Sequence, residues 1–349
     1  MLLMSKLFSW GGHDCVTIFI CLSGFSLTIP LAKSGYQTLL VPGNLRNYFI
    51  RRALRIAPPY FFAIAGVLLL AAIYPGISIQ TPTNWSFALP ILDLRTVLYH
   101  IFFVHALEPS QVYRLSPQFW SIGTEAQLYF WLPMVIVPLA VKKSFLWGII
   151  ASLIACMILL PIKQFDRACL HYVFTFSLGA LAADQIFNPQ RKGSGYQFGI
   201  VALAVGLYVG SVILAKSTGS IWGTRDLLLS PIIAFGIFAL ARNATPSRTI
   251  ERIRNILSSR TMMFLGKISY SLYLVHYVII GFLHALFVSN GLSVHLTVIG
   301  LILVAPLLSI FIAKLLQMTV EAPSMKLAKN YRDQGQKIVL AESPISAIK

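Results

Sequence analysis

Long apolar runs recur along the whole of this 349-residue chain, and they constrain its fold more than any other feature. A helix needs about 20 predominantly apolar residues to cross a bilayer, with some allowance for tilt. About nine stretches meet this length, which predicts an all-α, polytopic integral membrane helix bundle. The predicted spans are 14–32, 58–74, 126–141, 145–161, 170–187, 197–215, 227–241, 264–287 and 295–318.

Composition supports this fold class. Only 11% of the residues are charged and 57% are hydrophobic, whereas about a quarter of an ordinary soluble domain is charged. The net charge of +17 comes from basic residues that flank the apolar runs, so it indicates membrane topology and contact with lipid head groups rather than nucleic-acid binding. The four cysteines show no CxxC spacing, and we therefore expect neither a disulfide framework nor a metal site.

The distribution of Lys and Arg predicts the topology. A further apolar stretch, 97–107, contains His100 and His105 and is too short for an upright crossing. If it does not cross, 19 of the 28 basic residues fall on one side and 7 on the other, with two inside spans. The positive-inside rule then places the 19, together with the C-terminus, in the cytoplasm. We expect 97–107 to be a re-entrant or interfacial segment on the outer side.

Nine crossings with a cytoplasmic C-terminus place the N-terminus outside. We expect residues 1–13 to form an N-terminal stub that breaks at Gly11–Gly12, followed by a membrane domain at 14–323 and a cytoplasmic tail at 324–349. The stub is too short to be a signal peptide. The topology therefore predicts that a segment is missing upstream.

A basic segment, RNYFIRRALRIAPPYFF, precedes the second span at residues 46–62. Arg52 and Arg55 are three residues apart and share a helix face, next to Arg51. Paired guanidiniums can bind a phosphate or pyrophosphate in a bidentate manner, although a plain positive-inside anchor explains them as well. Pro58 and Pro59 favour a break or kink here.

Glu125 is the acidic residue closest to the span that follows it, and Tyr129 lies one helical turn further on the same face. An ionisable group entering a bilayer is a functional candidate, suited to accepting or donating a proton. A carboxylate favoured by the dipole at a helix N-terminus is the structural alternative.

Two histidines are further candidates. His276 lies in LGKISYSLYLVHYVII, residues 265–280, three residues after Tyr273, and interhelical hydrogen bonding explains such polar groups as well as catalysis does. His13 precedes Asp14 and could be a base, but adjacent helical residues point about 100° apart, which favours a surface role. In the same span, Ser23 and Gly24 allow a neighbouring helix to approach closely.

Taken in order, five strings resemble motifs of the acyltransferase type 3 family of integral membrane O-acyltransferases. They are CLSGF at 21–25, RALR at 52–55, WSIGTEAQLY at 120–129, SYSLYLVH at 269–276 and EAP at 321–323. The resemblance implies ten core helices in a bacterial inner membrane. It also implies transfer of an acyl group, commonly acetyl, from cytoplasmic acyl-CoA to a carbohydrate or lipid-linked glycan on the far side.

Carried over residue by residue, the resemblance implies that Arg52 and Arg55, with Arg51, bind the phosphates of acyl-CoA. Acyl-CoA is then a co-substrate, and no cofactor is implied. Glu125 and Tyr129 would lie toward the acceptor, and His276 would be a polar residue of the late helix.

This sequence differs from the pattern of the family at the start of the chain. Family members carry a helix with an Arg and a presumed His base before the LSGF element, whereas fewer than 25 residues precede CLSGF here. Either the start is assigned too far downstream or the chain is a truncated, inactive relative, and His13 could substitute for the base. A transporter or flippase of glycan or lipid intermediates is the alternative from another functional class.

Overall fold

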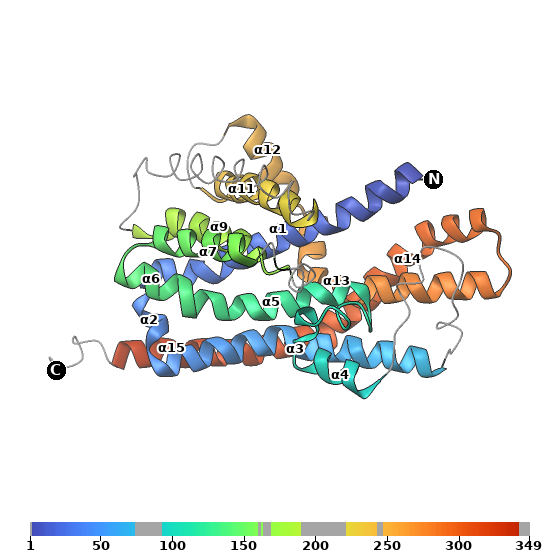
Figure 1. Cartoon of the computed structure of the whole chain (residues 1–349), viewed down its shortest axis with the longest axis horizontal. Coiled ribbons are helices and arrows are strands. Elements are labelled where there is room, and N and C mark those ends of the chain that lie inside the picture. The colour runs from blue at the N-terminus through green and yellow to red at the C-terminus, as the bar shows by residue number, and fades with distance from the viewer. Residues whose placement is uncertain are drawn as a thin grey trace. The chain divides into compact units, whose positions relative to one another are not determined.

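The protein is described by a computed structural model, in which the regular elements of the described residues are helices (Figure 1). The described residues are 2–73, 93–159, 162, 169–189, 221–242 and 247–341. They belong to two compact units. Unit 1 comprises Met1–Leu45 and Thr124–Asn255, and unit 2 comprises Arg46–Gly123 and Ile256–Lys349. The boundaries between them fall within α3, α5 and α12.

The helices follow the apolar runs closely. Unit 1 contains α1 (Leu2–Ser34), α2 (Gln37–Leu40), most of α5 (Trp120–Trp131), the π-turn Leu132–Ile136, α6 (Val137–Lys142), α7 (Phe145–Leu159), α9 (Tyr172–Phe187), α11 (Ile221–Ala241) and most of α12 (Arg248–Leu257). Unit 2 contains most of α3 (Pro42–Ile73), α4 (Leu94–Ile101), the 3-10 turns His105–Leu107 and Pro117–Phe119, α13 (Arg260–Ser289), α14 (Val294–Leu316), the π-turn Gln317–Glu321 and α15 (Ala322–Ala341).

The predicted all-α membrane bundle is confirmed. Five of the predicted spans fall on helical stretches that are long and apolar enough to cross a bilayer: Gly12–Ser34, Gly43–Ile73, Pro117–Lys142, Arg260–Ser289 and Val294–Tyr331. Three more fall on the shorter apolar helices Phe145–Leu159, Tyr172–Phe187 and Leu229–Ala241. The predicted span 197–215 lies outside the described residues.

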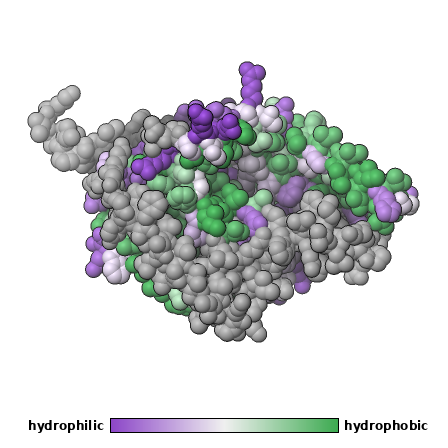
Figure 2. Space-filling view, turned by 90° about the horizontal axis from the view of Figure 1, so that it is seen from above, coloured by the Kyte–Doolittle hydropathy of each residue, from purple (hydrophilic) through white to green (hydrophobic). Residues whose placement is uncertain are grey.

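Exposed apolar side chains indicate the surfaces that face lipid. On α14, ten large apolar side chains are exposed: Val294, Leu296, Val298, Ile299, Ile302, Leu303, Val304, Leu307, Phe311 and Leu315. Figure 2 shows hydrophobic residues gathered in patches on the face that it displays. An apolar helix surface of this extent is typical of a membrane span rather than of a helix in water.

Close contact between α1 and α9 forms the centre of unit 1 (Figure 1). A Cβ atom at Gly24 would overlap the carbonyl oxygen of Phe176, and one at Gly179 would overlap the carbonyl oxygen of Cys21. The predicted close approach at Gly24 is therefore confirmed. Small residues at such positions let the backbones of two membrane helices meet directly.

The predicted helix break at Gly11–Gly12 is wrong, and of the break or kink predicted at Pro58 and Pro59 the break is wrong. Helix α1 starts at Leu2 and continues through Gly11–Gly12, because a glycine weakens a helix by only about 1 kcal/mol relative to alanine. Helix α3 continues through Pro58 and Pro59. Near this site the Tyr270 hydroxyl of α13 donates a 2.8 Å hydrogen bond to the Ile56 carbonyl.

The segment 97–107 is not a continuous helix. Helix α4 is capped by Asp93, whose Oδ1 accepts from the Thr96 amide at 2.5 Å, and it ends at Ile101. Phe103 then has a φ of 59°, a conformation that a bulky residue rarely adopts. A 3-10 turn follows at His105–Leu107. This shape agrees with a segment that does not cross the bilayer.

His100 and His105 make stability depend on pH. Burial lowers the pKa of His100 to about 3 and that of His105 to about 4, and the neighbouring His105 also lowers the pKa of His100. Because both values lie below those of the unfolded chain, the unfolded state binds more protons once the pH falls below about 6.5. We expect the unfolding temperature in detergent to fall between pH 7.5 and pH 5, and to fall less in His100→Asn. An equal fall in unfolding temperature between pH 7.5 and pH 5 for the wild type and His100→Asn would contradict this prediction.

Candidate active site

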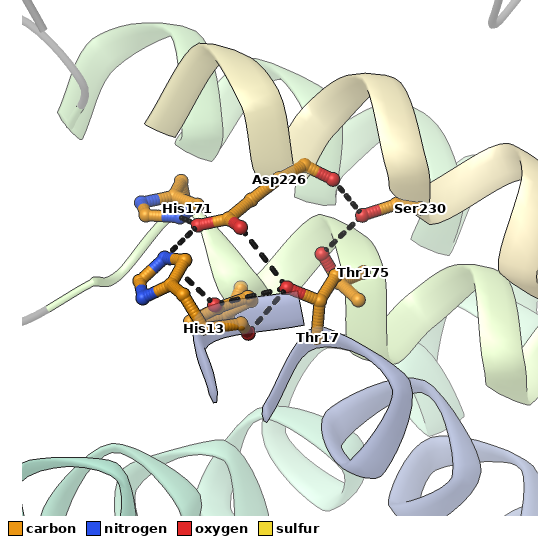
Figure 3. Close-up of polar contacts among 7 residues, drawn as sticks. His13, Thr17, His171, Thr175, Asp226 and Ser230 are labelled. Atoms are coloured by element: carbon orange, nitrogen blue, oxygen red, sulfur yellow. Dashed lines mark hydrogen bonds and ion pairs between the residues drawn. The ribbon is translucent and has the colours of Figure 1, made fainter. Parts of the chain in front are cut away.

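Two imidazoles meet one carboxylate in unit 1, at the junction of three chain segments (Figure 3). His13 Nε2 on α1 lies 2.7 Å from Oδ2 of Asp226 on α11. His171 Nε2, at the N-terminal cap of α9, lies 2.8 Å from the same oxygen. In the tautomers that donate from Nε2, both rings therefore bond the Asp226 carboxylate. We call His13, His171 and Asp226 the histidine–aspartate cluster.

A hydroxyl completes the hydrogen bonding of this carboxylate. Asp226 is fully buried, and a buried charge is tolerated only when it is paired and hydrogen-bonded. Thr17 Oγ1 donates to the second carboxylate oxygen, Oδ1, at 3.0 Å. The Tyr172 hydroxyl lies 3.1 Å from Thr17 Oγ1 and 3.3 Å from His13 Nε2. Both oxygens of Asp226 are thus held in place.

The backbone at Asp226 is also anchored. Ser230 Oγ donates to the Asp226 carbonyl at 2.5 Å and lies 2.6 Å from Thr175 Oγ1 of α9 (Figure 3). These contacts tie α11 to α9 one helical turn below the cluster. The position of the carboxylate is therefore set by both its side chain and its main chain.

The geometry of the histidine–aspartate cluster suits general base catalysis. When Nε2 donates to Asp226, Nδ1 carries the lone pair that can accept a proton. The side chain of His13 is 17% exposed, whereas those of His171 and Asp226 are 5% and 0% exposed. His13 is therefore the imidazole that a substrate can reach, and Asp226 would stabilise the imidazolium formed on it.

This environment differs from the one expected for His13. The sequence favoured a surface role beside Asp14, whereas the carboxylate that His13 binds is Asp226, 213 residues away. Sequence reasoning missed Asp226 and His171. A signal was present, because the predicted alternation of spans places residues 13, 171 and 226 at span ends on one side. Asp226 is also an acidic residue at the start of a span, as Glu125 is.

Glu125 and Tyr129 form a second polar group in unit 1. The Tyr129 hydroxyl donates to Glu125 Oε1 at 2.6 Å, as the one-turn spacing predicts, and Ser23 Oγ donates to the same oxygen at 3.2 Å. Ser23 belongs to CLSGF and Glu125 to WSIGTEAQLY, so two of the motifs meet here. Ser23 lies ten residues after His13 on α1, about 15 Å along the helix. The two polar groups are therefore separate.

Three other motifs meet inside unit 2. Ser271 Oγ of SYSLYLVH donates to Glu321 Oε2 of EAP at 2.5 Å, and Arg55 of RALR interacts electrostatically with the same carboxylate. The Arg52 guanidinium lies 6.0 Å from the centre of the Tyr48 ring. The negative charge of Glu321 therefore attracts the Arg55 guanidinium.

Arg51 and His276 lie in different surroundings. Arg51 Nη1 donates to the carbonyl of Tyr331 on α15 at 3.5 Å. This partner differs from the Glu321 carboxylate that interacts with Arg55. His276 Nδ1 lies 2.8 Å from the carbonyl oxygen of Tyr273 in its own helix. The Tyr273 hydroxyl donates to the Gln118 carbonyl at 2.8 Å. Hydrogen bonding between chain segments thus accounts for Tyr273.

No metal centre is found in the part of the chain that the structure describes, where no group of three or more His, Cys, Asp or Glu side chains could hold a metal ion. The four cysteines, all described, form no disulfide with one another.

Comparisons with known proteins place these features in a family. A family model described as an acyltransferase domain matches residues 11–314. The O-acetyltransferase OatA of Staphylococcus aureus, in strains NCTC 8325 and COL, is 25% identical over 324 residues, covering 84% of this chain and 50% of that protein. SACOL0978 of Staphylococcus aureus strain COL, provisionally named as an O-acetyltransferase, is 24% identical over 93% of this chain and 54% of its own length.

The chain thus spans about half the length of the curated relatives it matches. No solved structure matches it. The family model covers most of the chain, and it includes the histidine–aspartate cluster and four of the five motifs in full. On this basis, the chain belongs to the acyltransferase type 3 family.

Proposed function

We propose that this protein is a membrane O-acyltransferase that moves an acyl group, acetyl in the simplest case, from cytoplasmic acyl-CoA to a hydroxyl of a carbohydrate or glycolipid on the outer side. The family match supports the reaction class. The observation that carries the mechanism is the 2.7 Å contact between the reachable imidazole of His13 and the buried carboxylate of Asp226.

In this mechanism the proton and the acyl group move in one balanced exchange. His13 Nδ1 accepts the proton of the acceptor hydroxyl while the hydroxyl oxygen attacks the thioester carbonyl carbon. The carbon–sulfur bond then breaks and the proton passes to the CoA sulfur. The products are an ester and free CoA, and His13 returns to its neutral form. Asp226 orients the imidazole and stabilises its cationic form.

The donor and acceptor are assigned to different residues. Arg52 and Arg55 would bind the phosphates of acyl-CoA, since guanidiniums suit bidentate phosphate contacts, and Arg51 would support them. Glu125, Tyr129 and His276 would contribute to the acceptor side. Charge counting supports an orientation with Arg52, Arg55 and the C-terminus facing the cytoplasm, and a bacterial inner membrane follows from the family resemblance.

Replacing both Arg52 and Arg55 with alanine tests the donor assignment. We expect acyl-CoA-dependent acetylation of surface glycan to fall at least about 100-fold, because two charge-assisted contacts are lost, while the protein stays in the membrane. The matched control is Arg248→Ala with Arg252→Ala, at two exposed arginines of α12, which should acetylate normally. Normal acetylation by the Arg52/Arg55 variant would overturn the assignment. Transport of glycan without CoA would instead support the transporter alternative.

A further inference from the structure

A second cluster of titratable side chains lies inside unit 2 and has no part in the mechanism above. Tyr60, His100 and His105 are each 0% exposed. The rings of His100 and His105 are stacked, with centroids 4.0 Å apart and planes at 5°. The Tyr60 ring lies 6.3 Å from that of His105 at 21°. We call these three residues the tyrosine–histidine cluster.

Backbone contacts fix the orientation of both imidazoles. His100 Nδ1 lies 2.9 Å from the Thr96 carbonyl oxygen, and His105 Nε2 lies 2.9 Å from that of Phe119. A neutral imidazole that donates from Nδ1 carries its lone pair on Nε2. His100 therefore presents Nε2 as a hydrogen-bond acceptor. The stacking disfavours protonation of both rings at once, because two cations at this distance would repel each other strongly.

Three polar atoms of this cluster are left unsatisfied. Tyr60 Oη, His100 Nε2 and His105 Nδ1 are buried and have no hydrogen-bond partner among the described residues. Polar groups close to them in sequence are paired: Thr96 Oγ1 donates to Gln111 at 2.8 Å, and Ser116 Oγ donates to Gln118 at 2.6 Å. Buried polar atoms in proteins are nearly always paired, so three orphaned atoms in one cluster point to a missing partner.

Two of the orphaned atoms, Tyr60 Oη and His100 Nε2, have the hydrogen-bonding chemistry that complements a hydroxyl group. Tyr60 Oη can donate a hydrogen bond and His100 Nε2 can accept one, while a hydroxyl both accepts and donates. Two further aromatic rings lie beside Tyr60, with Phe103 and Phe119 centred 5.0 and 5.1 Å from the Tyr60 ring. Small-molecule sites commonly combine such apolar walls with a few placed polar groups. Phe103 is only partly buried and has the unusual φ of 59°.

We propose that Tyr60 and His100 bind a hydroxyl group of the carbohydrate acceptor. This rests on the proposed function. The role is substrate binding rather than catalysis. The third member, His105, holds the His100 ring in place through the stack.

Single-atom substitutions separate this role from a structural one. Tyr60→Phe removes only the orphaned hydroxyl, so the unfolding temperature should stay equal or rise, while KM for the acceptor should rise about tenfold for the lost hydrogen bond. His100→Asn keeps a donor for the Thr96 carbonyl but removes the acceptor at the Nε2 position. His100→Gln loses the donor for the Thr96 carbonyl but keeps an acceptor at the Nε2 position. A binding role predicts a higher KM in His100→Asn than in His100→Gln, and a purely structural role predicts the opposite order.

The experiment uses the full chain in detergent, with acetyl-CoA and a panel of methyl glycosides of glucose, galactose and N-acetylglucosamine as acceptors. Tyr113→Phe and His295→Asn, at exposed positions of the same unit, are the matched controls and should keep the wild-type KM. The second readout is the rise in unfolding temperature that a glycoside produces without CoA. This rise should be present in the wild type and absent in Tyr60→Phe.

The two readouts distinguish the site from the reaction. A glycoside that stabilises the wild type but not Tyr60→Phe, without any acetyl transfer, would support the site and count against the proposed function. Acetyl transfer with wild-type KM and wild-type thermal shift in both Tyr60→Phe and His100→Asn would overturn the site and leave the proposed function standing.

Discussion

Asp226→Asn is expected to lower kcat for acyl transfer about 100-fold or more, the scale on which positioned acid–base groups contribute. Asparagine has nearly the same shape as aspartate, so the cluster should still assemble. It lacks the negative charge, however, and it cannot stabilise an imidazolium on His13, which contacts Asp226 Oδ2 at 2.7 Å. The measurement is the rate of ester formation at saturating acyl-CoA, with KM for acyl-CoA expected to change little.

Asp184→Asn provides a matched control in the same unit. Asp184 is also fully buried, but it accepts from the Tyr36 hydroxyl at 2.7 Å and lies thirteen residues after His171, about 20 Å along α9. Its kcat should stay within about threefold of the wild type. If Asp226→Asn retained wild-type kcat, Asp226 would have no role in the reaction.

Gly179→Ala and Gly24→Ala are expected to destabilise unit 1 by about 3 kcal/mol or more, at the upper end of the range for overpacking. Each added methyl would overlap a backbone carbonyl of the facing helix, at Cys21 and Phe176 respectively. A backbone atom cannot move aside as a flexible side chain can, so α1 and α9 would have to separate. The measurement is the unfolding temperature of the purified protein in detergent.

Gly236→Ala is the matched control for these glycine variants. Gly236 lies within α11 of the same unit, and a Cβ atom there would meet nothing within 4 Å. Alanine should be neutral or stabilise this helix by up to about 1 kcal/mol. Equal unfolding temperatures for Gly24→Ala, Gly179→Ala and Gly236→Ala would show that α1 and α9 do not meet as described.

Local patterns in the sequence predicted most of the fold. Apolar runs fixed the positions of the helices because hydrophobicity and length are properties of contiguous residues. The pairing of Glu125 with Tyr129 was predictable for the same reason, since residues four apart share a helix face. The breaks predicted at Gly11–Gly12 and, as one alternative, at Pro58–Pro59 are wrong because helix propensity was considered without the packing contacts that can override it.

Contacts between distant segments could not be predicted in this way. The histidine–aspartate cluster joins positions 13, 171 and 226, and no local spacing relates them. Charge counting indicated only that these positions share one side. The same limit applies to Ser23 with Glu125 and to Ser271 with Glu321, where motifs far apart in sequence meet.

The most direct test of the central claim is acetyl transfer by the purified chain, comparing the wild type with His13→Ala. With labelled acetyl-CoA and a carbohydrate acceptor, the wild type should form a labelled sugar ester. His13→Ala should lose about 100-fold or more of this rate and recover part of it when free imidazole is added. Undiminished transfer by His13→Ala would contradict the account, because the hydroxyl would then be activated by another group.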